Sequence, residues 1–148
     1  RSTEQTGNMM SWDSLLICLL IEMTIATVGT DVTLTCNYDA EYYGRLSVCW
    51  GRGPIPNRGC ANEVIRSDGT SVTSRLSERY LLLGSMGEGD VSLTIRQVEE
   101  GDSGIYGCRV DIPGWFNDFK HQITLTVNAG ETSKNNHRKK EKQQLCSF

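Results

Sequence analysis

Residues 102–112 read "DSGIYGCRVDI", and this stretch decides the fold. Its second half alternates apolar and polar side chains, a pattern typical of a β-strand with one face turned to a core. Tyr106 stands two residues before Cys108, and an Asp-Ser-Gly turn precedes both. If Cys108 lies on the buried face of this strand, a disulfide with a second buried cysteine is expected, and the position of that cysteine helps to identify the fold.

Cys36, Trp50 and Cys108 follow one another in this order, each on the apolar face of an alternating segment. This is the frame of an immunoglobulin domain, in which a Cys36–Cys108 disulfide joins two sheets and packs against a buried tryptophan. Tyr106 occupies the place of the tyrosine corner of that fold. The interval between the two cysteines leaves room for the additional strands of a variable-type domain.

Alternating segments separated by turn signals predict the remaining strands. Variable-type domains often pair an Arg at the start of one strand with the Asp before the tyrosine corner, and Arg79 and Asp102 match those places. No long window has a helical period. The predicted fold is therefore all-β, an immunoglobulin variable-type two-sheet Greek-key sandwich, with strands expected at residues 31–38, 45–51, 63–67, 79–84, 89–98, 103–112 and 121–128.

The composition suits one extracellular domain. The chain has 148 residues, six cysteines and a formal net charge of -3. The cysteines indicate an oxidising compartment, and the net charge gives no indication of nucleic acid. We expect the domain over residues 27–129 and a disordered basic tail over 130–148.

Residues 1–26 are interpreted as a leader. The apolar run "LLICLLI" at 15–21 is too short to span a bilayer and fits the hydrophobic part of a secretory signal peptide. Translation could begin at Met9 or Met10, and small residues allow cleavage after Ala26. The alternative is a fragment with an incorrectly joined first exon.

A second pair of cysteines lies outside the core frame. Cys49 directly precedes Trp50, so its side chain is expected on the opposite, outer face of the sheet. Cys60 follows the loop "GRGPIPNRG" at residues 51–59. A Cys49–Cys60 disulfide would fold this loop back against the sheet, and a free reactive thiol is the alternative. The absence of a CxxC pair argues against structural zinc.

Three stretches carry a more specific resemblance: "CWGRG" (49–53), "EGDVSLTI" (88–95) and "DSGIYGCRVDIPGWFND" (102–118). Together they resemble the T-cell immunoglobulin and mucin-domain family of cell-surface receptors for phosphatidylserine and enveloped viruses. The resemblance covers about residues 28–129. It implies an extracellular domain, either of a type I membrane receptor or, if the chain is complete as given, of a secreted protein.

The chain departs from the family pattern in two places. Ile55 and Gly107 stand where relatives have a further disulfide, so one bond instead of two is expected to hold the loop at residues 51–59. The mucin stalk and membrane helix of the family are not seen in the 148 residues.

The motif "IPGWFND" (112–118) is the candidate site. Asn117 and Asp118 offer hard oxygen ligands that suit Ca²⁺, and the backbone carbonyls of Ile112 and Gly114 could add two more. Such a partial site would be weak and would be completed by an anionic ligand.

Trp115 and Phe116 are predicted to enter a bilayer beside that ion. The resemblance implies that the headgroup is phosphatidylserine, bound between this loop and residues 51–59. Arg52 and Arg58 could contact its phosphate, although both could equally be solvated charges. The alternative is that Trp115 folds back onto the sheet and the polar pair only stabilises a turn.

The predicted function is Ca²⁺-dependent phosphatidylserine binding, for recognition of apoptotic cells or immune regulation. The alternative is a protein-binding immune co-receptor domain that contacts another immunoglobulin-domain receptor, or a soluble decoy, without lipid binding. An enzyme is not expected, because neither a nucleophile–base pair nor a Gly-rich phosphate loop is found and His121 and His137 have no evident catalytic partner.

Overall fold

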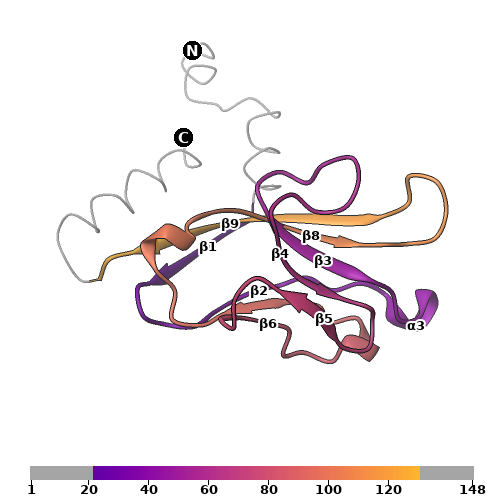
Figure 1. The fold of residues 1–148 in the computed structure, drawn as a ribbon, viewed down its shortest axis with the longest axis horizontal. Helices are drawn as coiled ribbons and strands as arrows, with labels where there is room; N and C mark the ends of the chain where they lie inside the picture. The colour runs from indigo at the N-terminus through magenta and orange to yellow at the C-terminus, as the bar shows by residue number, and fades with distance from the viewer. Residues whose placement is uncertain (1–21, 131–148) are drawn as a thin grey trace, which may run out of the picture.

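The computed structural model describes residues 22–130. Two sheets pack face to face (Figure 1), one with the strand order β1-β9-β8-β3-β4-β5 and the other with the order β2-β7-β6. The predicted all-β variable-type sandwich is confirmed. Its strands, within the residues described, are β1 (Glu22–Thr27), β2 (Val32–Leu34), β3 (Val48–Arg52), β4 (Glu63–Ser67), β5 (Val72–Arg75), β6 (Tyr80–Leu81), β7 (Leu93–Ile95), β8 (Gly104–Val110) and β9 (Phe119–Asn128).

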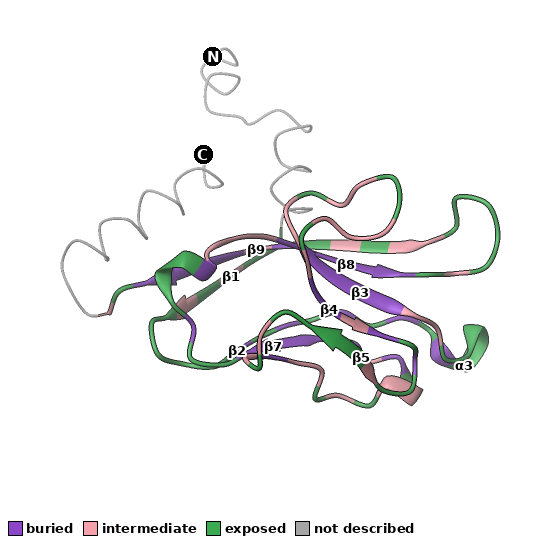
Figure 2. Ribbon diagram, in the orientation of Figure 1, coloured by how far each residue is buried: buried purple, intermediate pink, exposed green. Residues whose placement is uncertain are grey.

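The core lies between the two sheets, where the strands are buried (Figure 2). Trp50 is fully buried, and its indole N–H donates to the Val91 carbonyl over 2.8 Å. The Cys36–Cys108 disulfide joins the sheets, with its Cα atoms 6.6 Å apart. A buried indole with a satisfied N–H and a disulfide crossing the core together fix how the two sheets pack.

Asp102 takes part both in the tyrosine corner and in the predicted ion pair with Arg79. The Tyr106 hydroxyl donates to the Asp102 carbonyl over 2.6 Å. Arg79 contacts the Asp102 carboxylate with two nitrogens, over 2.8 and 3.0 Å. Burial alone would raise the pKa of Asp102, but hydrogen bonds from Arg79 and from the Glu99 backbone outweigh burial and lower it. This carboxylate is therefore charged when the domain is folded at neutral pH.

The N-terminal strand differs from the sequence-based boundary. β1 begins at Glu22 and runs parallel to β9, from Glu22 opposite Ile123 to Thr27 opposite Asn128. Residues 22–26, assigned above to the leader, thus form part of the sheet. Every residue of β1 is exposed or half-buried, so this edge strand lacks the apolar alternation by which a buried strand is recognised in a sequence.

β5 was also not predicted, because three of its four residues are exposed and its pattern is not that of a buried strand. Helical structure within residues 22–130 is limited to α3 (Ala40–Tyr43), η1 (Met86–Glu88) and η2 (Glu100–Asp102). None of these segments is long and apolar enough to cross a membrane. The apolar run at 15–21 and the basic tail at 131–148 lie outside the described residues.

Candidate ligand-binding site

The loop between β8 and β9, residues 111–118, has a compact backbone. Gly114 has a φ of 124°, a value that side chains rarely allow, and a Cβ there would collide with the Asn117 amide. That amide donates to the Pro113 carbonyl over 3.1 Å. The Pro-Gly pair and Asn117 therefore close the loop on itself, and the two aromatic residues between them are carried at its tip.

Trp115 and Phe116 project into solvent. Trp115 is 86% exposed and Phe116 is 100% exposed, with their ring centroids 6.4 Å apart. Phe116 also has a φ of 55°, which is uncommon for a residue other than glycine. Trp115 therefore does not fold back onto the sheet, which was the alternative. Two large apolar side chains at a strained, exposed tip are typical of a binding surface.

Arg109 connects this loop to the loop at residues 51–59. It is the second-last residue of β8 and its side chain is only 7% exposed. Its Nε donates to Asp118 Oδ2 over 2.8 Å. The two terminal nitrogens donate to three backbone carbonyls of the facing loop, those of Pro56, Asn57 and Gly59. A single buried guanidinium thus uses four of its five N–H donors to hold both walls of the site together.

Both carboxylate oxygens of Asp118 accept hydrogen bonds, Oδ2 from Arg109 and Oδ1 from the Ile112 backbone N–H over 3.1 Å. Each oxygen keeps a further lone pair, so these contacts orient the carboxylate and leave it able to bind a cation. No hydrogen bond to the carbonyl of Ile112 or Gly114 is found within residues 22–130. Carboxylate and carbonyl oxygens are the donor types that a hard cation such as Ca²⁺ prefers. Among residues 22–130 no group of three or more His, Cys, Asp or Glu side chains could hold a metal ion.

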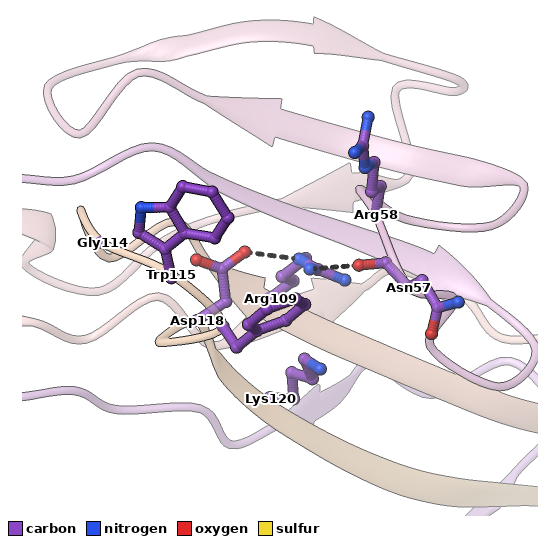
Figure 3. A pocket seen from close by; sticks show the side chains of 8 residues that line it. Asn57, Arg58, Arg109, Gly114, Trp115, Asp118 and Lys120 are labelled. Carbon is purple, nitrogen blue, oxygen red and sulfur yellow. Dashed lines mark hydrogen bonds and ion pairs between the residues drawn. The ribbon is translucent and has the colours of Figure 1, made fainter.

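A pocket of ≈ 320 Å³ lies between the two loops (Figure 3). Asp118 and Arg109 meet at its base, and Trp115 stands beside them. Arg58 and Lys120 make no ion pair within residues 22–130, so their charges are available to an anionic ligand. The pocket is lined by Asn57, Arg58, Arg109, Gly114, Trp115, Phe116, Asp118 and Lys120.

Ile55 and Gly107, the two positions at which the resemblance implied a further disulfide, are in contact. A Cβ on Gly107 would lie 2.5 Å from Ile55 Cγ1, so the isoleucine side chain covers the glycine directly. The Ile55 N–H also donates to Gln122 Oε1 over 3.0 Å. An apolar contact to β8 and a hydrogen bond to β9 thus hold Ile55 against the sheet.

The remaining disulfide of this loop is Cys49–Cys60, with Cα atoms 6.2 Å apart. Cys49 pairs with Arg109 across β3 and β8, so both side chains lie on the outer face of the sheet. The loop covers them, and Cys49 is only 2% exposed. The disulfide and the arginine therefore hold the same loop at neighbouring points.

The two arginines expected at the phosphate lie in different places. Arg58 lines the pocket. Arg52 does not: its guanidinium donates to the carbonyls of Gly101 and Ser103, over 3.1 and 2.7 Å, and lies over the Tyr106 ring. As the last residue of β3, Arg52 still belongs to the sheet and is not part of the loop that lines the pocket.

Sequence reasoning did not select Asn57, Arg109 or Lys120. Arg109 had a signal: a charged residue directly after Cys108, in a strand buried on both faces, needs several partners. Asn57 and Lys120 are ordinary polar residues in the sequence. Only the folding of the loop over β8 and β9 brings them to the pocket.

The fold and the loops together define a class of protein. The profile of the Immunoglobulin V-set domain family matches residues 22–128, so the chain is an immunoglobulin V-set domain over nearly all of its described length.

The solved structure of Tim-1 superposes with a TM-score of 0.73 at 46% identity, covering 76% of this chain and 96% of that one. The structure described as "Tim-4 in complex with phosphatidylserine" superposes with a TM-score of 0.70 at 45% identity, covering 74% of this chain and 100% of that one. Mouse T-cell immunoglobulin and mucin domain-containing protein 4 is 46% identical over 110 residues, covering 74% of this chain and 32% of the relative. The chain belongs to the T-cell immunoglobulin and mucin-domain family, and it spans about a third of the length of the curated relatives it matches.

Proposed function

We propose that this domain binds phosphatidylserine-containing membranes in a Ca²⁺-dependent way through the loop at residues 111–118. The observation that carries the proposal is the exposed Trp115–Phe116 pair directly beside a pocket lined by the Asp118 carboxylate and by Arg58 and Lys120, which form no ion pair with other residues of 22–130. A protein interface has no need for an oriented carboxylate behind exposed aromatic residues. The description of the Tim-4 structure as a complex with phosphatidylserine supports the choice of headgroup.

The metal would be held by Asp118 and the Gly114 carbonyl, from residues that line the pocket, together with Asn117 and the Ile112 carbonyl, from residues that line the neighbouring depression on the same loop. When bound, Ca²⁺ would supply positive charge for the carboxylate and phosphate oxygens of the headgroup. Arg109 keeps Asp118 in place through Nε, and the backbone N–H of Ile112 orients the second oxygen. In this proposal, contacts within the chain orient the Asp118 carboxylate for the cation before the ion binds.

The headgroup would lie in the pocket between Asp118 and the loop at residues 51–59. Arg58 and Lys120 would contact its phosphate. Trp115 and Phe116 would enter the bilayer, and transfer of each ring from water would contribute about 1.5–3 kcal/mol. In this arrangement the membrane contact and the headgroup contact are made by adjacent residues of one loop.

The corresponding biological role is an extracellular one: recognition of exposed phosphatidylserine on apoptotic cells or enveloped viruses, or regulation of immune cells. The test is co-sedimentation with phosphatidylserine vesicles in Ca²⁺ and in EDTA, with phosphatidylcholine vesicles as the control. Binding only to phosphatidylserine and only in Ca²⁺ is expected. Binding that persists in EDTA would contradict the Ca²⁺ dependence. Absence of binding to phosphatidylserine vesicles would favour the alternative, a protein-binding domain.

A further inference from the structure

A second pair of exposed aromatic residues lies at the same end of the domain as the Trp115–Phe116 tip. Tyr42 and Tyr43 form the last two residues of α3, and they are 78% and 43% exposed. Their rings meet edge to face, with centroids 4.7 Å apart. Figure 1 shows α3 and the loop between β8 and β9 projecting from the same end of the sandwich.

The backbone of this helix is firmly held. The Asp39 carboxylate accepts the Tyr42 N–H over 3.1 Å and caps the helix, while Ala40 is buried beneath it. At the other end, the Tyr38 hydroxyl donates to the Gly44 carbonyl over 2.9 Å and accepts the Leu46 N–H over 3.0 Å. A four-residue helix with both ends anchored is a rigid support for two exposed rings.

The two tyrosines and the candidate lipid-binding loop form one surface. A broad depression of ≈ 560 Å³ is lined by Tyr42 and Tyr43 from α3 and by Ile112, Pro113 and Asn117 from the loop. It shares no lining residue with the pocket of Asp118, but Pro113 and Asn117 directly flank the tip that carries Trp115 and Phe116. The tyrosine pair therefore borders the part of the loop proposed to meet the bilayer.

Tyrosine suits one particular layer of a membrane. Its ring is apolar and its hydroxyl needs water or a headgroup, so tyrosine concentrates at the boundary between headgroups and acyl chains. No hydrogen bond from the hydroxyl of Tyr42 or Tyr43 is found within residues 22–130. Glu41, exposed on the same helix, and the capping Asp39 would be repelled by anionic lipid. The chemistry of α3 thus fits the interfacial layer in general and not an anionic headgroup.

We propose that Tyr42 and Tyr43 form a second membrane contact, which enters the interfacial layer of the bilayer when the Trp115–Phe116 tip is inserted. This inference rests on the proposed function, because the tip sets the orientation of the domain on the lipid surface. The tyrosine pair adds affinity for the bilayer and fixes the tilt of the domain, and it makes no contribution to recognition of the headgroup.

The test compares variants on vesicles of phosphatidylserine and phosphatidylcholine in Ca²⁺. Tyr42→Ser with Tyr43→Ser should weaken vesicle binding about tenfold, with unchanged affinity for soluble glycerophosphoserine. Tyr42→Ser alone, at the more exposed position, gives the same direction without risk to the fold. Leu76→Ser is the matched control, because Leu76 is 71% exposed and lies outside both surfaces; it should leave vesicle binding unchanged.

Insertion is measured directly with a fluorescent reporter. Tyr42→Trp in a Trp115→Phe background places an indole on α3, and lipids brominated near the headgroup should quench it on Ca²⁺-dependent binding. The Trp115→Phe parent protein is the control for the other tryptophans. Quenching above that parent supports the inference.

Failure of the tyrosine contact can be distinguished from failure of the proposed function. If the wild-type protein binds phosphatidylserine vesicles, and the tyrosine variants bind equally well without quenching of the reporter, the tyrosine contact is wrong and the proposed function stands. If the wild-type protein does not bind these vesicles, both proposals are overturned.

Discussion

Arg109 Nε lies 2.8 Å from Asp118 Oδ2, and the same guanidinium donates to backbone carbonyls of the facing loop at Pro56, Asn57 and Gly59. One buried side chain therefore sets the distance between the two walls of the candidate pocket. The wall at residues 51–59 has one disulfide, Cys49–Cys60. The guanidinium supplies a second, non-covalent anchor close to it.

Replacing Arg109 with lysine should destabilise the domain although the charge is kept. A lysine ammonium cannot reproduce the planar fork, so Asp118 and several carbonyls of the facing loop lose their donors. The expected loss is about 2–4 kcal/mol in the free energy of unfolding, measured by urea denaturation. Arg58→Lys, at an exposed position of the same pocket, is the control and should change stability little. An equal effect of both substitutions would contradict the anchoring role of Arg109.

The contact between Ile55 and Gly107 predicts a pair of compensating substitutions. Gly107→Ala places a methyl group 2.5 Å from Ile55 Cγ1, which should cost about 1–3 kcal/mol of stability through overpacking. Ile55→Ala removes the colliding group. In an Ile55→Ala background, Gly107→Ala should therefore cost much less stability than it does in the wild-type protein. Purely additive effects of the two substitutions in thermal unfolding would show that the side chains do not meet.

The Arg79–Asp102 pair predicts a particular pH dependence. The pKa of Asp102 is lowered in the folded domain, so the pair stabilises the fold above the unfolded carboxyl pKa of about 3.9. That stabilisation is lost as the pH falls through the lower folded value. Asp102→Asn should therefore cost about 2–4 kcal/mol at pH 7 and much less near pH 2, measured by denaturant titration at each pH.

The control for that experiment is Glu63→Gln. Its ion pair with Arg66 is far more exposed, with side chains 38% and 30% accessible, and should contribute under about 1 kcal/mol. A pH profile of Asp102→Asn parallel to that of the wild-type protein would exclude the assigned role of this carboxylate.

The two halves of the loop should act on different ligands. Trp115→Ser with Phe116→Ser should reduce affinity for phosphatidylserine vesicles roughly 10- to 100-fold, because the rings no longer enter the bilayer. Affinity for soluble glycerophosphoserine should stay the same. Asn117→Ala should weaken the Ca²⁺-dependent binding of both ligands. Equal losses on the soluble ligand for both variants, measured by calorimetry, would show that the aromatic pair is not a membrane wedge.

The frame of the fold was predictable because its residues are few and chemically distinct. Cys36, Trp50, Tyr106 and Cys108 each have one place in an immunoglobulin domain, and the structure has them there. β4 was predicted with its observed bounds, since turn residues flank it on both sides. β1 was not, because an edge strand lacks the pattern of a buried one.

The candidate site was predictable in part. Its tip could be named because Trp115 and Phe116 have no apolar strand pattern around them, and a resemblance covers the whole motif. Arg109 could not be assigned to the pocket, because three of its four hydrogen-bond partners are backbone carbonyls, which carry no side-chain signal in the sequence. Arg52 and Arg58 are equivalent in a sequence, and only the end of β3 separates the one in the sheet from the one in the loop.

The central claim is that the loop at residues 111–118 binds the phosphatidylserine headgroup together with Ca²⁺. The most direct test is a titration of ¹⁵N-labelled protein with glycerophosphoserine, followed by NMR, with and without Ca²⁺. We predict saturable shifts of the amides of Asn57, Gly114 and Asp118 that require both components and are reversed by EDTA. Shifts confined to other faces of the domain, or no shifts when both components are present, would contradict the claim.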